Sequence, residues 1–371
     1  MNTLKRAVIK IGSNSLSQPQ GGINEQIIDQ LAEVIAELRV QGIDVILVSS
    51  GAVAAGMAKM KLKERPRDIV GKQATAAVGQ GILIERYSYY FDKHGLSCAQ
   101  ILLSRIDLVE AGHYRNARNT LEKLLNYGIV PIVNENDTVV FEELCFGDND
   151  RLSALVAGMI NADLLILMTD VDGLYTANPA THPDAVLIRH VDDVSKVKGL
   201  ADGAGSAVGT GGMVTKLKAA EMATRFGTAT FLMNASRMKE ISGMIKDACP
   251  LGTYFPQAKH KMNSKKRWIA YAALSNGTII IDSGAEKALL RDGKSLLASG
   301  VTGAQGFWER KDLVKIVNAQ GEEVARGIIE LSSEETDRVK GLHSEEILKL
   351  IPDLKAEELV HRDNLTVTLE C

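Results

Sequence analysis

The fold is decided by a pattern that is clearest in Asp44-Val-Ile-Leu-Val-Ser-Ser-Gly-Ala-Val-Ala-Ala-Gly56, where an apolar run leads through a short polar turn into small residues. A continuous apolar run of this length is typical of a strand that is buried on both faces, as in a parallel sheet. The same alternation of short apolar runs and longer amphipathic patterns continues from residue 5 to about residue 235. We therefore predict an α/β fold with a mostly parallel open sheet sandwiched by helices.

Six apolar runs are expected to form the strands of this sheet: residues 7–11, 44–49, 96–103, 129–133, 164–169 and 228–233. Five stretches between them have helical patterns: residues 26–41, 72–93, 115–127, 151–161 and 215–226. Ligands of open α/β sheets bind outside the carboxyl ends of the strands. The small and polar residues that follow four of the strands are therefore the candidate site: residues 12–13, 49–51, 134–137 and 169–170.

The pattern changes near residue 255. Two prolines, Pro250 and Pro256, and a basic cluster at residues 259–267 indicate a boundary there. Beyond it, short strand-like runs alternate with turn glycines. We predict a first domain over residues 1–258, a linker over 259–275, and a small, mainly-β domain over 276–371.

Composition limits the classes of function. The 371 residues are 45% hydrophobic and 24% charged, which is typical of a globular protein long enough for two domains. The net charge of −3 gives no general attraction to nucleic acid or anionic membranes. The four cysteines form no C-x-x-C pair and no histidine spacing resembles a zinc site, so we expect no metal site built by side chains. The sequence has no secretory or membrane-spanning pattern, which predicts a cytoplasmic protein without a membrane partner.

The glycine-rich stretch Gly209-Thr-Gly-Gly-Met-Val-Thr-Lys216 runs directly into an amphipathic helix. Glycines let backbone N–H groups approach an anion closely, and a helix start adds unpaired donors and the positive end of its dipole. The stretch does not match a Walker A loop, and an ordinary loop before a helix is the alternative interpretation. Because Lys216 supplies a cation beside these donors, we interpret the stretch as a phosphate-binding turn.

Lys10, within the first predicted strand, is the second candidate cation. A lysine in an apolar strand is costly unless its amine reaches solvent or an anionic partner. The alternative is an edge-strand lysine whose amine extends to solvent. If Lys10 and Lys216 meet at one edge of the sheet, they suit a reaction whose transition state spreads negative charge over phosphoryl oxygens.

Asp148, Asn149 and Asp150 precede the helix that is expected to begin near Arg151. Capping of this helix explains one of them but not three. Carboxylates at this position can orient lysine amines, and amides and carboxylates can bind a substrate ammonium group. The turn at residues 49–56 could hold a second anionic group, such as a substrate carboxylate, although a simple strand–helix turn is the alternative.

Taken together, these residues resemble the amino acid kinase family. Four motifs carry the resemblance: Val8-Ile-Lys-Ile-Gly-Ser13, Val48-Ser-Ser-Gly-Ala52, Leu167-Met-Thr-Asp-Val-Asp-Gly-Leu-Tyr-Thr176 and Gly209-Thr-Gly-Gly-Met-Val-Thr-Lys216. Four finer motifs are similar to family members that phosphorylate L-glutamate: Gln73-Ala-Thr-Ala-Ala-Val-Gly-Gln80, Ile129-Val-Pro-Ile-Val-Asn-Glu-Asn-Asp137, Gly147-Asp-Asn-Asp150 and Lys266-Arg-Trp268. The tail from residue 276 resembles a PUA domain.

The resemblance implies a reaction in which ATP phosphorylates the side-chain carboxylate of L-glutamate, giving L-glutamyl 5-phosphate in the committing step toward proline. Lys10 and Lys216 are then catalytic cations positioned by Asp150, and Mg²⁺ bridges the β- and γ-phosphates of ATP. A carboxylate nucleophile is already ionised at pH 7, so the reaction needs no strong general base.

The resemblance also implies binding residues and regulation. The glutamate contacts match Ser50, Asp137 and Asn149, with Asp148 assisting. The nucleotide contacts match Lys10, Thr169, Asp170, Thr210, Gly211, Gly212, Met213, Val214, Thr215 and Lys216. Free proline is the expected feedback inhibitor at the glutamate site, and a homo-oligomer, either a dimer or a tetramer, is the expected assembly.

Two other functions are open at this point. One is a kinase for another small acid or for a nucleoside monophosphate. The other is an RNA-binding protein that acts through its C-terminal domain, because PUA domains elsewhere bind RNA. Residues 276–371 contain 12 Lys and Arg against 18 Asp and Glu, a net charge of −6. Since binding to a phosphate backbone relies on clustered positive charge, RNA is not the expected partner.

Overall fold

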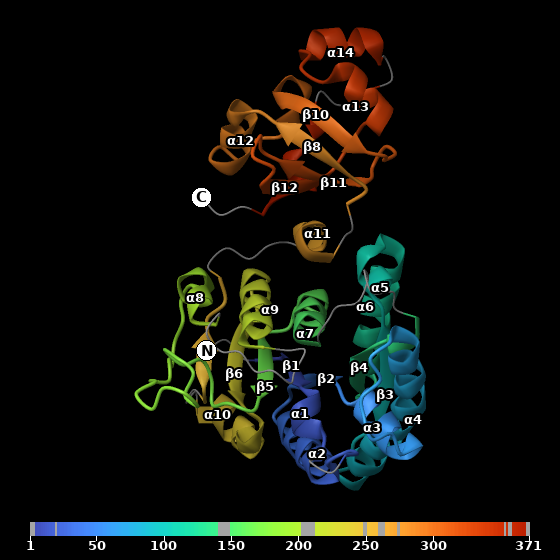
Figure 1. Cartoon of the computed structure of the whole chain (residues 1–371), viewed down its shortest axis with the longest axis vertical. Helices are drawn as coiled ribbons and strands as arrows, with labels where there is room; N and C mark the ends of the chain where they lie inside the picture. The colour runs from blue at the N-terminus through green and yellow to red at the C-terminus, as the bar shows by residue number, and fades with distance from the viewer. Residues whose placement is uncertain are drawn as a thin grey trace. The chain divides into compact units, whose positions relative to one another are not determined.

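A computed structural model divides the chain into two compact units, Met1–Lys261 and Met262–Cys371. Figure 1 shows the elements of both units along the chain. The structure describes residues 4–18, 21–139, 149–201, 212–247, 251–258, 264–272, 275–351, 354 and 358–368. The expected first domain over residues 1–258, linker over 259–275 and second domain over 276–371 stay predictions.

The N-terminal unit is built on a seven-stranded sheet with the strand order β3-β4-β2-β1-β5-β6-β7. Its strands are β1 (Arg6–Ile11), β2 (Asp44–Ser49), β3 (Cys98–Leu103), β4 (Val130–Glu135), β5 (Leu164–Thr169), β6 (Ala229–Asn234) and β7 (Thr253–Phe255). Neighbouring strands from β3 to β6 are parallel, and only the edge strand β7 runs antiparallel among these seven. The predicted α/β class with a mostly parallel sheet is therefore confirmed.

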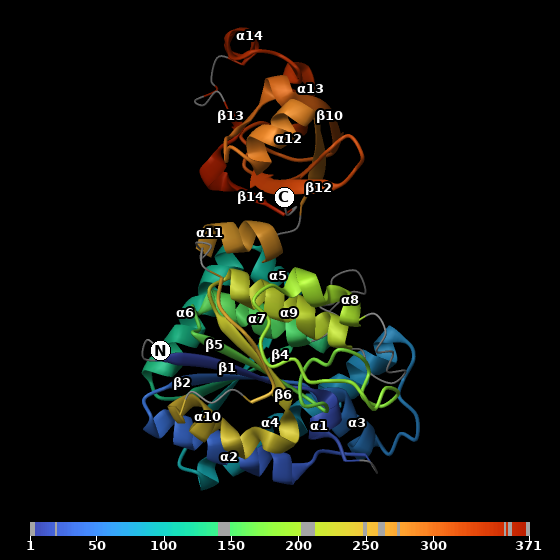
Figure 2. The same ribbon diagram turned by 90° about the vertical axis from the view of Figure 1, so that its left-hand side faces the viewer.

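Helices cover both faces of this sheet. They are α1 (Ser13–Leu16), α2 (Glu25–Val40), α3 (Ala52–Met60), α4 (Ile69–Lys93), α5 (Arg105–Val109), α6 (Ala111–Asn126), α7 (Asn149–Met159), α8 (Lys198–Ala201), α9 (Met213–Arg225) and α10 (Ile241–Asp247). Figure 2 shows α2, α4 and α10 on one face and α7, α8 and α9 on the other. The helix α2 faces the sheet with an apolar stripe at i, i+3, i+4 and i+7 spacing, from Ile28 to Leu38.

Side-chain alternation along β1 assigns its residues to the two faces. Ala7, Ile9 and Ile11 belong to the large apolar core that includes α2 and α4. Because successive side chains of a strand point to opposite faces, Lys10 projects toward the face covered by α7 and α9. This alternation places a buried lysine on the central strand, so the edge-strand interpretation of Lys10 is wrong.

Several elements differ from the sequence-based expectation, among them the short helices α1, α8 and α10, which were not expected. The helix α7 begins at Asn149, two residues before the expected start at Arg151. The short helix α5 was not expected, and it begins with a capping box formed by Ser104 and Asp107. The strand β7 has only three residues, too few for an alternating pattern to stand out in the sequence.

The C-terminal unit is built on a five-stranded sheet with the order β10-β8-β11-β12-β14. The strands are β8 (Gly277–Ile281), β10 (Val301–Gly306), β11 (Leu313–Val317), β12 (Glu323–Ile328) and β14 (Leu365–Val367). A second pair joins β9 (Leu296–Leu297) to β13 (Glu358–Val360). Three helices accompany these strands: α12 (Ser283–Leu290), α13 (Ser333–Val339) and α14 (Ser344–Leu350). The β-rich character expected for this part of the chain is confirmed.

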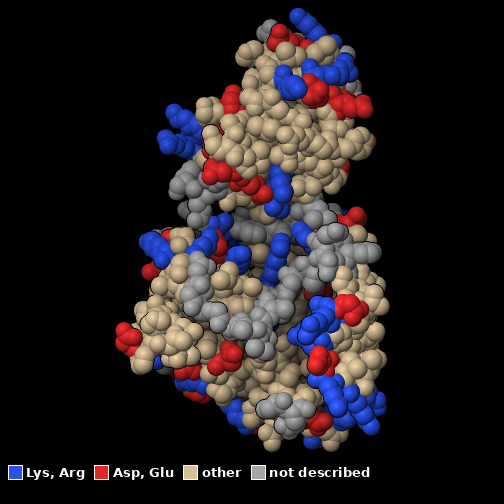
Figure 3. Space-filling view, viewed as in Figure 1, with Lys and Arg blue, Asp and Glu red and all other residues tan. Residues whose placement is uncertain are grey.

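Trp308 lies at the centre of the C-terminal core and donates a hydrogen bond from Nε1 to the Leu331 carbonyl oxygen at 3.1 Å. The helix α11 (Ser264–Arg267) and the helical turn that follows it precede this core, and Ile269 forms a separate small apolar cluster with Leu313. Figure 3 shows one face of the unit, where a broad area of uncharged residues is bordered by acidic and basic side chains.

Among the described residues, none of the helices is both long and apolar enough to cross a membrane.

Candidate active site

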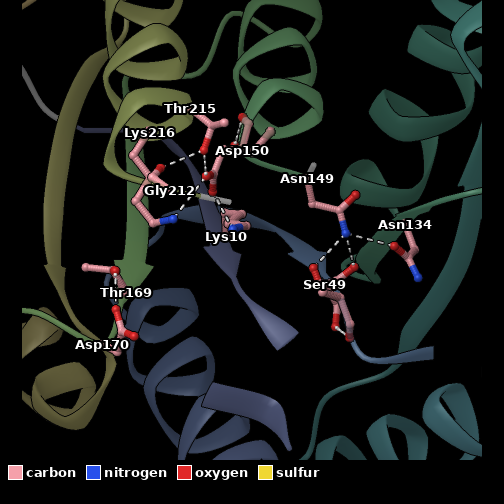
Figure 4. A network of polar contacts seen from close by, with 12 residues as sticks. Lys10, Ser49, Asn134, Asn149, Asp150, Thr169, Asp170, Gly212, Thr215 and Lys216 are labelled. Atoms are coloured by element: carbon pink, nitrogen blue, oxygen red, sulfur yellow. Dashed lines mark hydrogen bonds and ion pairs between the residues drawn. The ribbon is translucent and has the colours of Figure 1, made fainter. Parts of the chain in front are cut away.

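Two lysines from distant parts of the sequence contact one carboxylate. Lys10 projects from the central strand β1 and its Nζ forms an ion pair with Asp150 Oδ1. Lys216 projects from the first turns of α9, and its Nζ lies 3.2 Å from Asp150 Oδ2. All three side chains are buried, with Asp150 completely shielded from solvent. Figure 4 shows these three residues together with Thr215, and we call the four residues the lysine cluster.

The charges of the lysine cluster determine the ionisation of Asp150. Burial by itself raises the pKa of this carboxyl, but the positive charges of Lys10 and Lys216, with hydrogen bonds from Lys10 and Thr215, outweigh it and hold the pKa below its usual range. Asp150 is therefore ionised at neutral pH. With both lysines protonated, the three groups carry a net charge of +1, which leaves attraction for a further anion.

Thr215 connects the lysine cluster to the glycine turn. Its Oγ1 lies 2.9 Å from Asp150 Oδ2 and 2.8 Å from the Gly212 carbonyl oxygen. Gly212 is the N-cap of α9, and Met213, Val214 and Thr215 form the first turn. The first N–H groups of an α-helix have no partner within the helix, so this turn directs donors and the positive end of the helix dipole toward the lysine cluster.

A second group of polar side chains lies beside the lysine cluster, as Figure 4 shows. We call it the amide cluster: Ser49, Ser50, Asn134 and Asn149. The Asn149 Nδ2 atom lies 2.9 Å from the Ser49 carbonyl oxygen, 2.8 Å from Ser50 Oγ and 2.9 Å from Asn134 Oδ1. These contacts join the carboxyl ends of β2 and β4 to the start of α7.

Gly51 ends the turn after β2 and is the N-cap of α3, with a φ of 105°. This left-handed conformation favours glycine, because a Cβ is strained there. The turn therefore presents Ser50 at a helix start, where backbone donors can meet an anionic group.

Asp137 follows β4 and begins the 3₁₀ turn Asp137–Val139. Burial raises the pKa of its carboxyl to about 6, against the opposing charge of Arg65. The side chain is half-buried, and an ammonium partner beside it would favour the ionised form.

Thr169 and Asp170 lie at the carboxyl end of β5, and Thr169 Oγ1 donates to Asp170 Oδ1 at 3.0 Å. The neighbouring strand β6 ends at Asn234, whose Nδ2 donates to the Asp170 carbonyl oxygen at 3.3 Å and to Asp172 Oδ1 at 3.0 Å. Figure 4 shows Thr169 and Asp170 on the side of the lysine cluster away from the amide cluster, and we call this pair the wall.

Three predicted site residues, Asp148, Thr210 and Gly211, lie outside the described residues. The structure brings together Lys10, Asp150 and Lys216 in one cluster and Ser50 and Asn149 in the other. The sequence pattern marked Asn134 only as part of a polar strand end, and it gave no sign of the hydrogen bonds that join this residue to Gln80 of α4 and Asn149 of α7. Gln80 of α4 was noted only as the end of a sequence motif, and Tyr87 of the same helix was missed altogether.

The described side chains of the site do not form a metal-binding cage. Within the part of the chain that the structure describes, no group of three or more His, Cys, Asp or Glu could hold a metal ion. Both oxygens of Asp150 face lysine amines. This side-chain set does not fit a metal cage, but it is compatible with Mg²⁺ bound mainly through substrate phosphates, which is its usual mode in nucleotide sites.

Comparison with known proteins gives concordant matches for the two units. The model of the amino acid kinase family matches residues 5–234, and the model of the PUA domain matches residues 277–351. A glutamate 5-kinase of Desulfitobacterium hafniense (strain Y51) is 61% identical over 370 residues, covering 100% of both chains. The glutamate 5-kinase of Geobacter sulfurreducens is 45% identical over 368 residues, covering 99% of this chain and 98% of the relative.

A solved structure shares the fold of the N-terminal part. The carbamate kinase from Giardia lamblia bound to AMP-PNP has a TM-score of 0.51 and 17% sequence identity, covering 70% of this chain and 100% of that chain. At this identity the similarity bears on the fold alone.

Proposed function

The chain belongs to the amino acid kinase family, and from this premise we propose that it transfers the γ-phosphoryl group of ATP to the side-chain carboxylate of L-glutamate. The product is L-glutamyl 5-phosphate, and the step opens the route to proline. The observation that carries the proposal is the shared contact of Lys10 and Lys216 with Asp150, beside the amide cluster. The full-length similarity to glutamate 5-kinases supports the choice of glutamate.

The lysine cluster is proposed to stabilise the transferring group. Phosphoryl transfer needs little covalent chemistry from the protein and depends on positioning and on stabilisation of negative charge. Lys10 and Lys216 approach one point from β1 and α9, and Asp150 holds both amines in place through its two oxygens. Because the cluster is shielded from water, its net positive charge stabilises the negative phosphoryl oxygens more strongly than it would in solvent.

The acceptor is proposed to bind at the amide cluster. Ser50 and Asn149 contact glutamate, Asp137 receives its ammonium group, and Asp148 assists. Glutamate is ionised at pH 7, since an ordinary glutamate carboxyl has a pKa of about 4.3. The acceptor carboxylate can therefore attack the γ-phosphorus of ATP in line without a general base. None of the proposed site residues is assigned that role.

The nucleotide is proposed to bind between the wall formed by Thr169 and Asp170 and the first turn of α9. Its phosphates meet the backbone donors of Thr210, Gly211, Gly212, Met213, Val214, Thr215 and Lys216. Magnesium would be held mainly by the phosphates of the nucleotide, and it would neutralise part of their charge. Lys10 contacts the transferring phosphate from β1, whereas Lys216 contacts it from α9.

Regulation and assembly belong to the same proposal. Free proline, which carries the same α-carboxylate and a positive amine, is proposed as a feedback inhibitor at the acceptor site. The assembly is proposed to be a homo-oligomer, a dimer or a tetramer. The net charge of −6 over residues 276–371 disfavours an RNA-binding role for the C-terminal unit.

A trapping assay tests the reaction. Purified protein is mixed with ATP, Mg²⁺ and one acid, and the acyl phosphate is captured with hydroxylamine as a coloured hydroxamate. L-Glutamate should give product, whereas L-aspartate and N-acetyl-L-glutamate should give little. Product from either of these two acids in preference to L-glutamate would overturn the choice of substrate.

A further inference from the structure

Tyr87 of α4 is completely buried and its hydroxyl lies 2.8 Å from Ser49 Oγ. Ser49 is the last residue of β2 and is also completely buried. Its hydroxyl donates to the Ser50 carbonyl oxygen at 3.0 Å. Because Ser49 has a single hydroxyl proton and directs it to that carbonyl, the proton in the bond between the two hydroxyls belongs to Tyr87.

This arrangement forms a chain of hydrogen bonds that ends on the turn of the proposed acceptor site. Tyr87 donates to Ser49, and Ser49 donates to the backbone of Ser50. On its other side, the same turn is held by Asn149 Nδ2, which contacts the Ser49 carbonyl oxygen and Ser50 Oγ. Burial raises the pKa of the Tyr87 phenol above its ordinary value, so the donor keeps its proton.

The helix α4 reaches the amide cluster at a second point. Gln80 Oε1 accepts a hydrogen bond from Asn134 Nδ2 at 2.9 Å, and Asn134 in turn contacts Asn149. Gln80 and Tyr87 are seven residues apart, which is two helical turns, so both lie on one face of α4. One face of this helix therefore supports both sides of the amide cluster.

The backbone of α4 is also fixed against α3, the helix that begins directly after the Ser50 turn. A Cβ on Gly79 would lie 1.8 Å from the Ala52 carbonyl oxygen, and a Cβ on Gly56 would lie 1.9 Å from the Thr75 carbonyl oxygen. The two helices are therefore in direct backbone contact. Such packing fixes the position of α4, so the Tyr87 hydroxyl can hold the turn in one place.

We propose that Tyr87 is a positioning residue for the acceptor substrate, acting through Ser49 on the turn that presents Ser50. The inference rests on the proposed function, because it assumes that the acceptor binds at the amide cluster. Tyr87 does not touch the substrate, and its effect is transmitted by the buried hydroxyl pair.

The substitution Tyr87→Phe tests the inference because it removes one hydroxyl and keeps the ring that packs edge-on to Phe91. We expect the KM for glutamate to rise about 3- to 10-fold, which corresponds to the loss of one ordinary hydrogen bond. Both kcat and the KM for ATP should stay within about twofold of wild type, since the lysine cluster is untouched. Ser49→Ala should raise the same KM, and the double variant should show no further increase over Ser49→Ala.

Tyr90→Phe is the matched control. It removes a tyrosine hydroxyl from the same helix, one that donates to Glu25 of α2 at 2.7 Å, and it should leave the KM for glutamate unchanged. An unchanged KM for glutamate in Tyr87→Phe overturns the inference, as does an equal loss of affinity for both substrates together with a lower Tm. If Tyr87→Phe does not fold, Ser49→Ala gives the same readout. Failure of the wild type to phosphorylate glutamate would instead refute the proposed function.

Discussion

Asn149 and Asp150 are consecutive residues in the first turn of α7, yet they contact the two different clusters of the site. Asn149 Nδ2 lies 2.8 Å from Ser50 Oγ in the amide cluster, whereas Asp150 contacts the amines of Lys10 and Lys216. Successive residues of an α-helix are rotated by about 100°, so neighbouring side chains can serve opposite sides of one helix start. The first turn of α7 thus joins the proposed acceptor side to the proposed phosphoryl side.

Asp150→Asn should weaken both turnover and stability. The change leaves two buried amines without their counter-charge, and loss of one partner from a buried ion pair costs about 3–5 kcal/mol. Because the pKa of Asp150 is lowered in the folded protein, its stabilising effect is complete above the ordinary carboxyl pKa of about 3.9 and is lost as the pH falls below it. In urea unfolding, the difference in the free energy of unfolding between wild type and variant should be constant from pH 8 to pH 5. This difference should narrow below about pH 4. A gap that widens toward acid pH would contradict the assignment.

Lys216→Ala should lower kcat by about 100- to 1000-fold, the usual effect of removing one donor that stabilises transition-state charge. The fold should be retained, because Asp150 keeps its ion pair with Lys10. The exposed Lys218 of the same helix provides the control, and Lys218→Ala should have normal turnover. Steady-state kinetics and circular dichroism measure both effects, and a near-normal kcat in Lys216→Ala would remove this lysine from the mechanism.

Asp137 predicts a pH dependence of glutamate affinity. Its carboxyl has a pKa raised to about 6, and only the ionised form attracts the substrate ammonium. The kcat/KM for glutamate should therefore be constant from pH 8 to about pH 7 and fall below about pH 6 by up to tenfold per unit. Asp137→Asn should raise the KM for glutamate and abolish this acid limb. If the fall of kcat/KM toward acid pH remains in Asp137→Asn, a group other than Asp137 causes it.

Two glycines of α4 give opposite predictions for the same substitution. Gly79→Ala places a Cβ 1.8 Å from the Ala52 carbonyl oxygen, so α3 and α4 must separate, at a cost of about 1–3 kcal/mol. Gly81→Ala meets nothing within 4 Å and should stabilise the helix by up to about 1 kcal/mol. Thermal unfolding measures both changes, and the KM for glutamate should rise only in Gly79→Ala. Equal effects of the two substitutions would show that the contact between α3 and α4 does not control the turn.

The sequence pattern predicted six of the seven strands of the N-terminal sheet, and it led us to propose a site at their carboxyl ends. The apolar runs at residues 44–49 and 164–169 coincide with β2 and β5, because strands buried on both faces leave a continuous apolar signature. The rule that ligands bind at the carboxyl ends of such strands then selects Ser50, Thr169 and Asp170 without knowledge of their contacts.

The hydrogen bonds within the site could not be predicted in the same way. Tyr87 and Ser49 are 38 residues apart, and a buried tyrosine at helical spacing looks the same in a sequence whether or not its hydroxyl has a partner. Asn134 likewise connects α4 to α7 only after the strand register has placed it. Periodicity identifies the buried face of an element, whereas pairing across elements depends on the packed structure.

The central claim is that Lys10 and Lys216 act together on one phosphoryl group. A crystal structure with ADP, Mg²⁺, aluminium fluoride and L-glutamate tests it most directly, because the fluoride complex stands in for the group in transfer. We predict that both Nζ atoms lie about 3 Å from fluorines of that group and that Asp150 remains between them. A complex in which either amine points away from the aluminium fluoride would contradict the account.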